Sequence, residues 1–252
     1  MGRFHRHVDG TTHTHERHDH ELGDHTAYAT GPERVTVLER IFTENDRAAD
    51  ANRSAFADAG VVCLNVMSSP GAGKTTVLAA TLTHLRERGL RAGVVEGDIE
   101  TSIDADRLRG LAQQVSLLNT ANGFGGECHL DAPMVARALH GLDLDELDVV
   151  LVENVGNLVC PAEFDVGAHQ RVMVCSVTEG EDKPLKYPVM FRSVDAVLVN
   201  KTDLLPYLDL EIDLLERNIR TVNPTAALLR ISARTGDGLD SWYAWLDEAI
   251  TS

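Results

Sequence analysis

The sequence predicts an α/β fold, in which a mostly parallel β-sheet carries helices on both faces and follows a disordered, histidine-rich tail. Three observations lead to this prediction. From about residue 61 onward apolar runs alternate with helical stretches, these runs are nearly continuous, and the first thirty residues contain almost nothing apolar. Continuous apolar strands separated by helices are typical of a parallel sheet that is covered on both faces.

Composition limits the function classes that fit the chain. Its 252 residues suffice for one α/β domain with an appendage. No apolar stretch reaches the roughly 18 residues of a membrane span, and no signal-peptide core is present, so a cytoplasmic protein is expected. A net charge of -16 argues against nucleic-acid binding, which depends on Lys and Arg. Four cysteines in a chain of this length do not indicate a disulfide framework.

The elements follow from the hydrophobic pattern. Residues 1–30 are expected to be disordered, 31–60 to hold a leading helix from Val35 to about Ala59, and 61–252 to form the main domain. Strands are predicted at Val61–Met67, Arg91–Glu96, Val115–Leu118, Val149–Val152, Arg171–Ser176, Ala196–Val199 and Ala227–Ile231. Helices are predicted at Thr75–Arg88, Pro133–Leu142, Leu210–Thr221 and Leu239–Ile250.

The tail is the part of the sequence that is richest in histidine. Because its other residues are mostly polar or charged, it cannot bury enough apolar surface to offset the entropy of ordering. Neutral imidazoles are good ligands for divalent Ni, Zn and Cu, so a dense histidine tract predicts metal chelation, here nickel storage. The candidate ligands are His5, His7, His13, His15, His18, His20 and His25.

The strongest motif is a phosphate-binding loop, Ser68-Ser-Pro-Gly-Ala-Gly73-Lys74-Thr75-Thr76. It follows an apolar strand and opens a helix, so backbone N–H groups and the helix N-terminus can both face phosphate oxygens. Lys74 supplies a charge for the β- and γ-phosphates, and the Thr75 hydroxyl can bind Mg²⁺. Its first position is Ser68, where this pattern usually has glycine. The nucleotide ligands expected here are Gly71, Ala72, Gly73, Lys74, Thr75 and Thr76.

The base is predicted from Asn200-Lys201-Thr202-Asp203, at the end of another strand. The Asp203 carboxylate can accept from N1–H and the 2-amino group of guanine, whereas adenine offers no matching pair of donors. Lys201 can lie along the base plane and Asn200 can brace the neighbouring loops. A backbone N–H of Ser232-Ala233, after the next strand, can meet the guanine 6-oxo group. The sequence thus predicts a P-loop NTPase that prefers GTP.

Mg²⁺ binding and hydrolysis need carboxylates at the ends of further strands. Glu153 begins Glu153-Asn-Val-Gly156, which resembles the D-x-x-G switch of G proteins, and the Gly156 N–H can reach the γ-phosphate. Asp98 is a second candidate Mg²⁺ ligand, and Asp104 can orient the attacking water. The alternative is that Asp98 and Asp104 are turn and helix-cap residues. Since the sequence shows no arginine finger and no catalytic Gln, slow intrinsic turnover is expected.

A separate metal site is predicted from Cys128, His129 and Cys160. Two thiolates and one imidazole suit Ni²⁺ or Zn²⁺, and three ligands leave a position open for water or for a partner. Cys160 lies seven residues after Glu153, so a loop that γ-phosphate reorganises would also move this thiolate. Cys63 and Cys175 lie inside apolar strand patterns and are expected to be inert core residues.

Taken together, these motifs resemble the GTPase of [NiFe]-hydrogenase maturation, the HypB family, from about Ile41 to the C-terminus. The matching segments are Ser69-Pro-Gly-Ala-Gly-Lys-Thr-Thr, Glu127-Cys-His-Leu-Asp-Ala, Glu153-Asn-Val-Gly-Asn-Leu-Val-Cys-Pro and Thr178-Glu-Gly-Glu-Asp-Lys-Pro-Leu-Lys-Tyr-Pro. The resemblance implies a GTP-dependent homodimer that delivers nickel to the hydrogenase large-subunit precursor with a zinc-containing metallochaperone of the HypA type. Some members carry an N-terminal Cys-x-x-Cys nickel site, but this chain has no cysteine before Cys63.

Three other interpretations stay open at this stage. The first is a urease-type nickel GTPase, which shares the P-loop but has a different client. The second is a nickel-storage protein in which the nucleotide site is incidental. The third is a P-loop kinase, which would transfer phosphate to a small molecule instead of water.

Overall fold

The computed structural model describes residues 4–6, 12–14, 32–97, 108–118 and 129–251. Contacts divide the chain into two units, Met1–Ile41 and Phe42–Ser252. Within the first unit, strands β1 (Phe4–Arg6) and β2 (Thr12–Thr14) pair antiparallel, with His5 opposite His13. The other five tail histidines lie outside the described residues, and the disorder of residues 1–30 stays a prediction.

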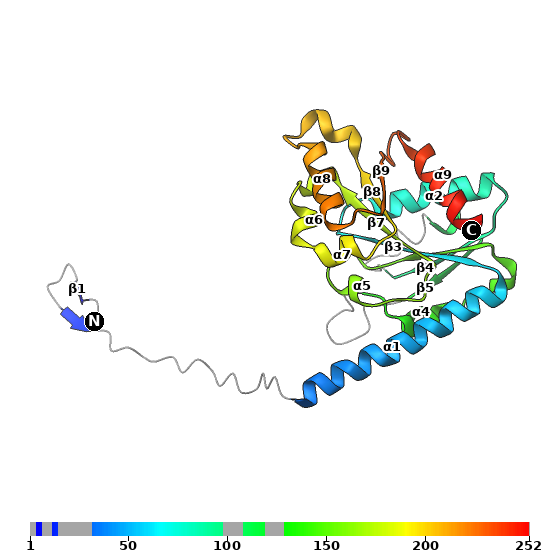
Figure 1. Cartoon of the computed structure of the whole chain (residues 1–252), viewed down its shortest axis with the longest axis horizontal. Coiled ribbons are helices and arrows are strands. Elements are labelled where there is room, and N and C mark those ends of the chain that lie inside the picture. Colours follow the sequence, from blue (N-terminus) through cyan, green and yellow to red (C-terminus); the bar gives the residue numbers. More distant parts are fainter. Residues whose placement is uncertain (1–3, 7–11, 15–31, 98–107, 119–128, 252) are drawn as a thin grey trace. The chain divides into compact units, whose positions relative to one another are not determined.

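A seven-stranded sheet forms the centre of the second unit (Figure 1), in the order β5-β4-β6-β3-β7-β8-β9. All pairs of neighbouring strands in this sheet are parallel. The predicted α/β fold with a parallel sheet is therefore confirmed, and each predicted strand has its counterpart within two residues. The strands are β3 (Val62–Ser68), β4 (Ala92–Glu96), β5 (Gln114–Leu117), β6 (Val149–Glu153), β7 (Gln170–Ser176), β8 (Ala196–Asn200) and β9 (Ala227–Arg230).

Helices cover both faces of this sheet because successive strand residues point to opposite sides. On one face, Leu64 and Val66 of β3 pack with apolar residues of α2 and α9. On the other face, Cys63 packs with residues of α1 and α4, and Met67 with residues of α7 and α8. The α-helices are α1 (Pro32–Ala59), α2 (Lys74–Glu87), α4 (Ala132–Leu139), α5 (Cys160–Glu163), α6 (Lys183–Lys186), α7 (Pro188–Arg192), α8 (Ile212–Val222) and α9 (Leu239–Thr251).

Helix ends follow the local signals in the sequence. Gly60 has a φ of 68° and its N–H bonds to the Ala57 carbonyl, which ends α1 close to the predicted boundary at Ala59. The Asp131 carboxylate accepts from the Met134 N–H at 2.7 Å and so caps α4. The short helices α5, α6 and α7 were not predicted. Among the described residues, no helix is long and apolar enough to cross a membrane.

The order of the strands determines where a site can form. The next strand in the chain after β3 is β4, which lies toward one edge of the sheet. β7, β8 and β9 lie between β3 and the opposite edge. Ligands of open α/β sheets bind beyond the carboxyl ends of the strands, at the point where the strand order reverses. The phosphate-binding loop follows β3, Glu153 is the last residue of β6, and Asn200 is the last residue of β8. This edge therefore gathers the predicted nucleotide residues.

Candidate nucleotide and metal site

The phosphate-binding loop joins β3 to α2 at the predicted edge of the sheet. Gly71 and Gly73 have φ values of 72° and 97°, in the region that side chains disfavour. A Cβ added to Gly73 would lie 2.6 Å from the Asn200 Nδ2 atom. Glycine at position 73 is therefore required both by the backbone conformation and by the close approach of the Asn200 side chain. The loop leads directly to Lys74, the first residue of α2.

Lys74, Thr75 and Glu153 meet at the start of α2. The Thr75 hydroxyl donates to the Glu153 Oε1 atom at 2.8 Å, and the Lys74 Nζ atom lies 3.6 Å from the same oxygen. Glu153 is fully buried, and its Oε2 atom has no hydrogen-bond partner among the described residues. Buried carboxylate oxygens are rarely left unpaired. A hydroxyl beside an unsatisfied carboxylate oxygen is a suitable ligand pair for Mg²⁺, so these residues fit the metal that the motif implies.

Asn200 and Lys201 tie the Asn200-Lys201-Thr202-Asp203 segment to the phosphate-binding loop. The Asn200 amide donates to the Ala72 carbonyl at 2.9 Å and accepts from the Ala233 N–H at 3.1 Å. The Lys201 ammonium donates to the Gly71 carbonyl at 2.6 Å. Lys201 has a φ of 64°, the one positive value outside glycine in the described part of the chain. Such a conformation costs free energy, and it persists where surrounding contacts enforce it, often at functional sites.

Asp203 lies in a cavity that is suited to a nucleobase. Its Oδ1 atom accepts from the Ser232 hydroxyl at 2.7 Å, and its Oδ2 atom is 3.7 Å from Arg234. Each oxygen keeps further lone pairs, so the carboxylate can still accept two donors from a base. The cavity has a volume of about 570 Å³ and is lined by Gly73, Thr76, Asn200, Lys201, Asp203, Leu204, Ala233 and Arg234. Six of the residues predicted for nucleotide binding thus share one cavity.

The metal-site prediction falls only partly on described residues. Cys160 is the first residue of α5 and is half-buried, whereas Cys128 lies outside the described part of the chain. The His129 ring lies 4.2 Å, centroid to centroid, from the ring of Phe164, the residue that follows α5. The structure therefore brings His129 beside the segment that carries Cys160. Among the described residues, no group of three His, Cys, Asp or Glu side chains could hold a metal ion.

The remaining residues singled out in the sequence are two aspartates, one glycine and two cysteines. Asp98 and Asp104 lie outside the described residues, so their roles as Mg²⁺ ligand and water-orienting group stay predictions. Gly156 is half-buried in the segment between β6 and α5. Cys63 and Cys175 are buried, and burial raises the pKa of both thiols well above the ordinary value. They are core residues, in agreement with the sequence prediction.

Two residues at this edge were missed by sequence reasoning. Glu179 accepts from the Ser69 hydroxyl of the phosphate-binding loop and from the Ser176 N–H, and it pairs with Lys183 at 3.4 Å. Glu179 lies in Thr178–Pro188, one of the segments that resemble the HypB family, and this resemblance could have indicated a role for it. Asn154 follows Glu153 in the chain and is completely buried. Its side chain forms hydrogen bonds with the Leu130 N–H, the Val155 N–H and the Asn65 side chain. In a single sequence, an Asn that follows Glu153 shows no pattern that would predict a role for it.

Comparisons with known proteins agree with this geometry. A family model described as "CobW/HypB/UreG, nucleotide-binding domain" matches residues 62–230. The hydrogenase maturation factor HypB of Rhizobium leguminosarum bv. viciae is 47% identical over 216 residues, which cover 85% of this chain and 71% of the relative.

Two solved structures of the same kind share the fold. HypB from Archaeoglobus fulgidus has a TM-score of 0.76 and 33% identity, and the match covers 82% of this chain and 99% of that chain. HypB from Helicobacter pylori, solved in complex with nickel, has a TM-score of 0.75 and 34% identity, with 82% and 95% covered. With its parallel sheet, its phosphate-binding loop and these relatives, the chain belongs to the HypB family of hydrogenase maturation factors.

Proposed function

We propose that this protein is a GTP-hydrolysing metallochaperone that binds nickel and delivers it to the [NiFe]-hydrogenase large-subunit precursor. The observation that carries the proposal is the hydrogen-bonded junction of two motifs, in which Asn200 and Lys201 donate to carbonyls of the phosphate-binding loop. This junction sets the base cavity beside Lys74 and Thr75. A single nucleotide can therefore reach both the base-selecting carboxylate and the phosphate-binding groups.

Within this proposal each nucleotide residue has a defined task. The Asp203 carboxylate accepts from guanine N1–H and the 2-amino group, and the Ser232 hydroxyl fixes its orientation. The loop N–H groups from Gly71 to Thr76 hold the phosphates, together with the positive end of the α2 dipole. Lys74 neutralises charge that develops on the β- and γ-phosphates during transfer to water. Stabilisation of that charge lowers the barrier to hydrolysis.

The residues for Mg²⁺ are Thr75 and Glu153, with Asp98 as a third candidate. When bound, Mg²⁺ supplies charge neutralisation at the β- and γ-phosphate oxygens. Glu153 accepts a hydrogen bond of 2.8 Å from the Thr75 hydroxyl, which fixes the position of that oxygen at the start of α2. Asp104 is proposed to orient the attacking water, and the Gly156 N–H is proposed to bind the γ-phosphate. The bound γ-phosphate then determines the position of the segment that leads to Cys160.

Nickel is the cargo, and Cys128, His129 and Cys160 are its proposed transfer site, which Zn²⁺ can also occupy. The contact between the His129 and Phe164 rings supports this assignment, because it holds the imidazole beside the Cys160 helix. The related HypB from Helicobacter pylori that was solved with nickel supports the identity of the metal. We further propose that the protein forms a homodimer when GTP is bound, works with a HypA-type partner and acts in the cytoplasm. The alternative is that it serves a urease in place of a hydrogenase.

The test is the substitution Lys74→Ala. GTP hydrolysis should fall to background, because no other described cation lies beside Glu153 at the phosphate end of the site. The far-UV circular dichroism spectrum serves as the control for folding. Unchanged turnover in a folded variant would refute the role of the phosphate-binding loop.

The same variant separates the competing functions in a deletion strain. A metallochaperone should lose hydrogenase activity at low nickel and regain part of it when nickel is in excess. A storage protein with an incidental nucleotide site should instead retain its full effect on nickel supply. A kinase would show phosphate transfer to a small molecule in the unmutated protein, with little release of free phosphate.

A further inference from the structure

Asn154 lies between the two sites, and the proposed function gives it no task. We propose that Asn154 is the positioning residue that links the nucleotide state to the backbone beside His129. The inference rests on the proposed function, since it assigns a path by which GTP and metal binding influence each other. It concerns one side chain, and it can be tested without a metal.

The hydrogen bonds of Asn154 span three segments. Its Oδ1 atom accepts from the Leu130 N–H at 3.1 Å and from the Val155 N–H at 2.9 Å, and its Nδ2 atom donates to the Asn65 Oδ1 atom at 3.2 Å. The Asn154 N–H itself bonds to the Val66 carbonyl of β3 at 3.0 Å. The side chain is completely buried, and it is therefore in no position to exchange these partners for water.

Leu130 is the neighbour of His129, and its position depends on the ends of two strands. Its N–H is held by Asn154, directly after β6, and its side chain fills the space above Gly97, directly after β4. A Cβ on Gly97 would lie only 2.4 Å from the Leu130 Cδ1 atom. The Gly97 N–H also bonds to the Glu153 carbonyl at 3.0 Å. A displacement of Glu153 thus acts on Leu130 through both its backbone and its side chain.

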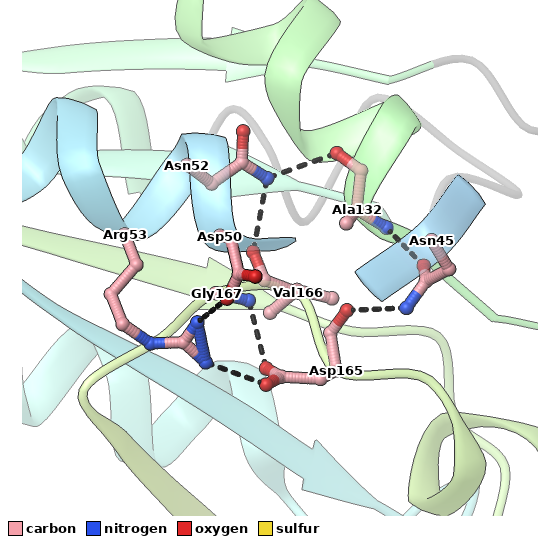
Figure 2. A network of polar contacts seen from close by, with 8 residues as sticks. All are labelled: Asn45, Asp50, Asn52, Arg53, Ala132, Asp165, Val166 and Gly167. Carbon is pink, nitrogen blue, oxygen red and sulfur yellow. Dashed lines mark hydrogen bonds and ion pairs between the residues drawn. The ribbon is translucent and has the colours of Figure 1, made fainter. Parts of the chain in front are cut away.

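The other end of the same loop is anchored elsewhere. The Ala132 N–H donates to Asn45 Oδ1 at 2.9 Å, and the Ala132 carbonyl accepts from Asn52 Nδ2 at 3.0 Å. Both asparagines belong to α1, which also binds the segment after α5, since Asn52 donates to the Val166 carbonyl (Figure 2). The helix therefore anchors, at Ala132 and Val166, the two segments that carry the proposed metal ligands. Asn154 is the contact that reaches Leu130 from the nucleotide side.

The chemistry of an amide makes this contact sensitive to small movements. A hydrogen bond weakens steeply when its distance or angle departs from the favoured range, so a shift of about 1 Å at residue 154 breaks or remakes it. A buried N–H is seldom left without a partner, so the Leu130 backbone moves to a new position when this bond breaks. The backbone of His129 moves with it, which changes the direction of the imidazole relative to Cys160.

Amide hydrogen exchange of the full-length chain tests the inference without metal. Exchange at Leu130 is compared between the GDP state and a non-hydrolysable GTP analogue, in the unmutated chain and in Asn154→Ala. The unmutated chain should show a difference of roughly tenfold, the change expected for one hydrogen bond of about 1.4 kcal/mol. Asn154→Ala should exchange rapidly in both states. Asn65→Ala keeps the Oδ1 acceptor of Asn154 but removes the partner of its Nδ2 atom, so the Asn154 side chain is free to rotate. The difference in exchange at Leu130 between the two nucleotide states should then be intermediate.

The matched control is Asn45→Ala, which loosens the same loop from the α1 side. It should speed exchange at Ala132 equally in both nucleotide states and leave the difference at Leu130 intact. The functional readout is Ni²⁺ affinity in full-length chains whose seven tail histidines are replaced by alanine. The ratio of affinities in the two states should lie at roughly 5- to 150-fold and fall toward one in Asn154→Ala, but not in Asn45→Ala.

The outcomes are distinct. If Asn154→Ala keeps the full nucleotide-dependent difference at Leu130, the role of Asn154 is wrong. If the unmutated chain shows no difference while it hydrolyses GTP, this inference fails and the proposed GTPase function stands. If the unmutated chain neither hydrolyses GTP nor prefers guanine, the proposed function fails as well.

Discussion

Asp203 is the residue on which base selection depends in the proposed site. It occupies the cavity beside Asn200 and Lys201, and the Ser232 hydroxyl holds one of its oxygens at 2.7 Å. A carboxylate accepts hydrogen bonds on both oxygens, whereas an amide presents one acceptor and one donor. Guanine offers two donors on the edge that would face Asp203. The charge and the acceptor pattern of this side chain therefore both favour guanine.

The substitution Asp203→Asn should sharply reduce the preference for GTP over ATP. One of the two charge-assisted hydrogen bonds becomes a contact between two donors, and a hydrogen bond to a charged group contributes about 1.5–3 kcal/mol. Affinity for GDP should fall by roughly 10- to 100-fold, measured by titration calorimetry.

Ser232→Ala is the milder companion variant, since it removes only the hydroxyl that orients Asp203. It should weaken GDP binding without reversing base preference. Equal turnover of GTP and ATP by the unmutated protein would contradict the guanine assignment altogether.

At the level of single residues, the sequence predicted the site where a motif carries its own geometry. Asn200 ends β8 and Asp203 lies three residues after it, while Lys74 and Thr75 begin the helix that follows the loop after β3. They meet at one edge of the sheet because parallel strands end together. Asn154 and Glu179 could not be found in this way. Their roles depend on contacts with Leu130 and Ser69, which are distant in the sequence and become adjacent only in the folded chain.

The elements of the fold were predicted where they are long and uniform in composition. Strands such as β6 and β8 are completely buried and rich in Val and Leu, so their pattern is unambiguous. Helices α5, α6 and α7 have four or five residues and begin beside prolines. A helical period cannot be recognised over so few residues, and tertiary contacts decide their conformation.

Helix α1 contributes to stability through buried polar contacts as well as through Phe56. Asn52 is buried and donates to two carbonyl groups, those of Ala132 and Val166. Arg53 pairs with Asp165 at 2.7 Å and with Asp50 at 3.2 Å, near the surface (Figure 2). The contacts differ in burial, so their contributions to the free energy of unfolding should differ as well.

Asn52→Ala is expected to lower the free energy of unfolding by about 1–3 kcal/mol, because two buried carbonyls lose their donor. For a chain of this size the melting temperature should fall by roughly 2–12 °C. Asp50→Ala removes only an ion pair whose acidic side chain is 83% exposed, so it should cost at most about 1 kcal/mol. Thermal unfolding followed by circular dichroism compares the two variants, and equal losses would contradict the role of Asn52.

For the whole molecule, the tail and the main domain are expected to act independently in nucleotide hydrolysis. The tail has seven histidines and a smaller share of apolar residues than the rest of the chain, and it precedes all the nucleotide motifs. Deleting residues 1–30 should lower the number of Ni²⁺ ions bound per chain and leave GTP turnover nearly unchanged. Equilibrium dialysis with Ni²⁺ measures the first quantity. An unchanged number of bound ions would show that the tail has no part in nickel storage.

The hydrogen bonds from Asn200 and Lys201 to the phosphate-binding loop have a consequence for how a nucleotide enters. Both bonds join groups of the chain itself, as does the bond from the Ala233 N–H to Asn200. The conformational entropy of ordering these loops is therefore lost during folding, not during association. Preorganisation of this kind raises affinity because binding no longer has to order the loops. Nucleotide capture should accordingly be fast and nearly rigid around the base, with slower rearrangement confined to the segment after Glu153.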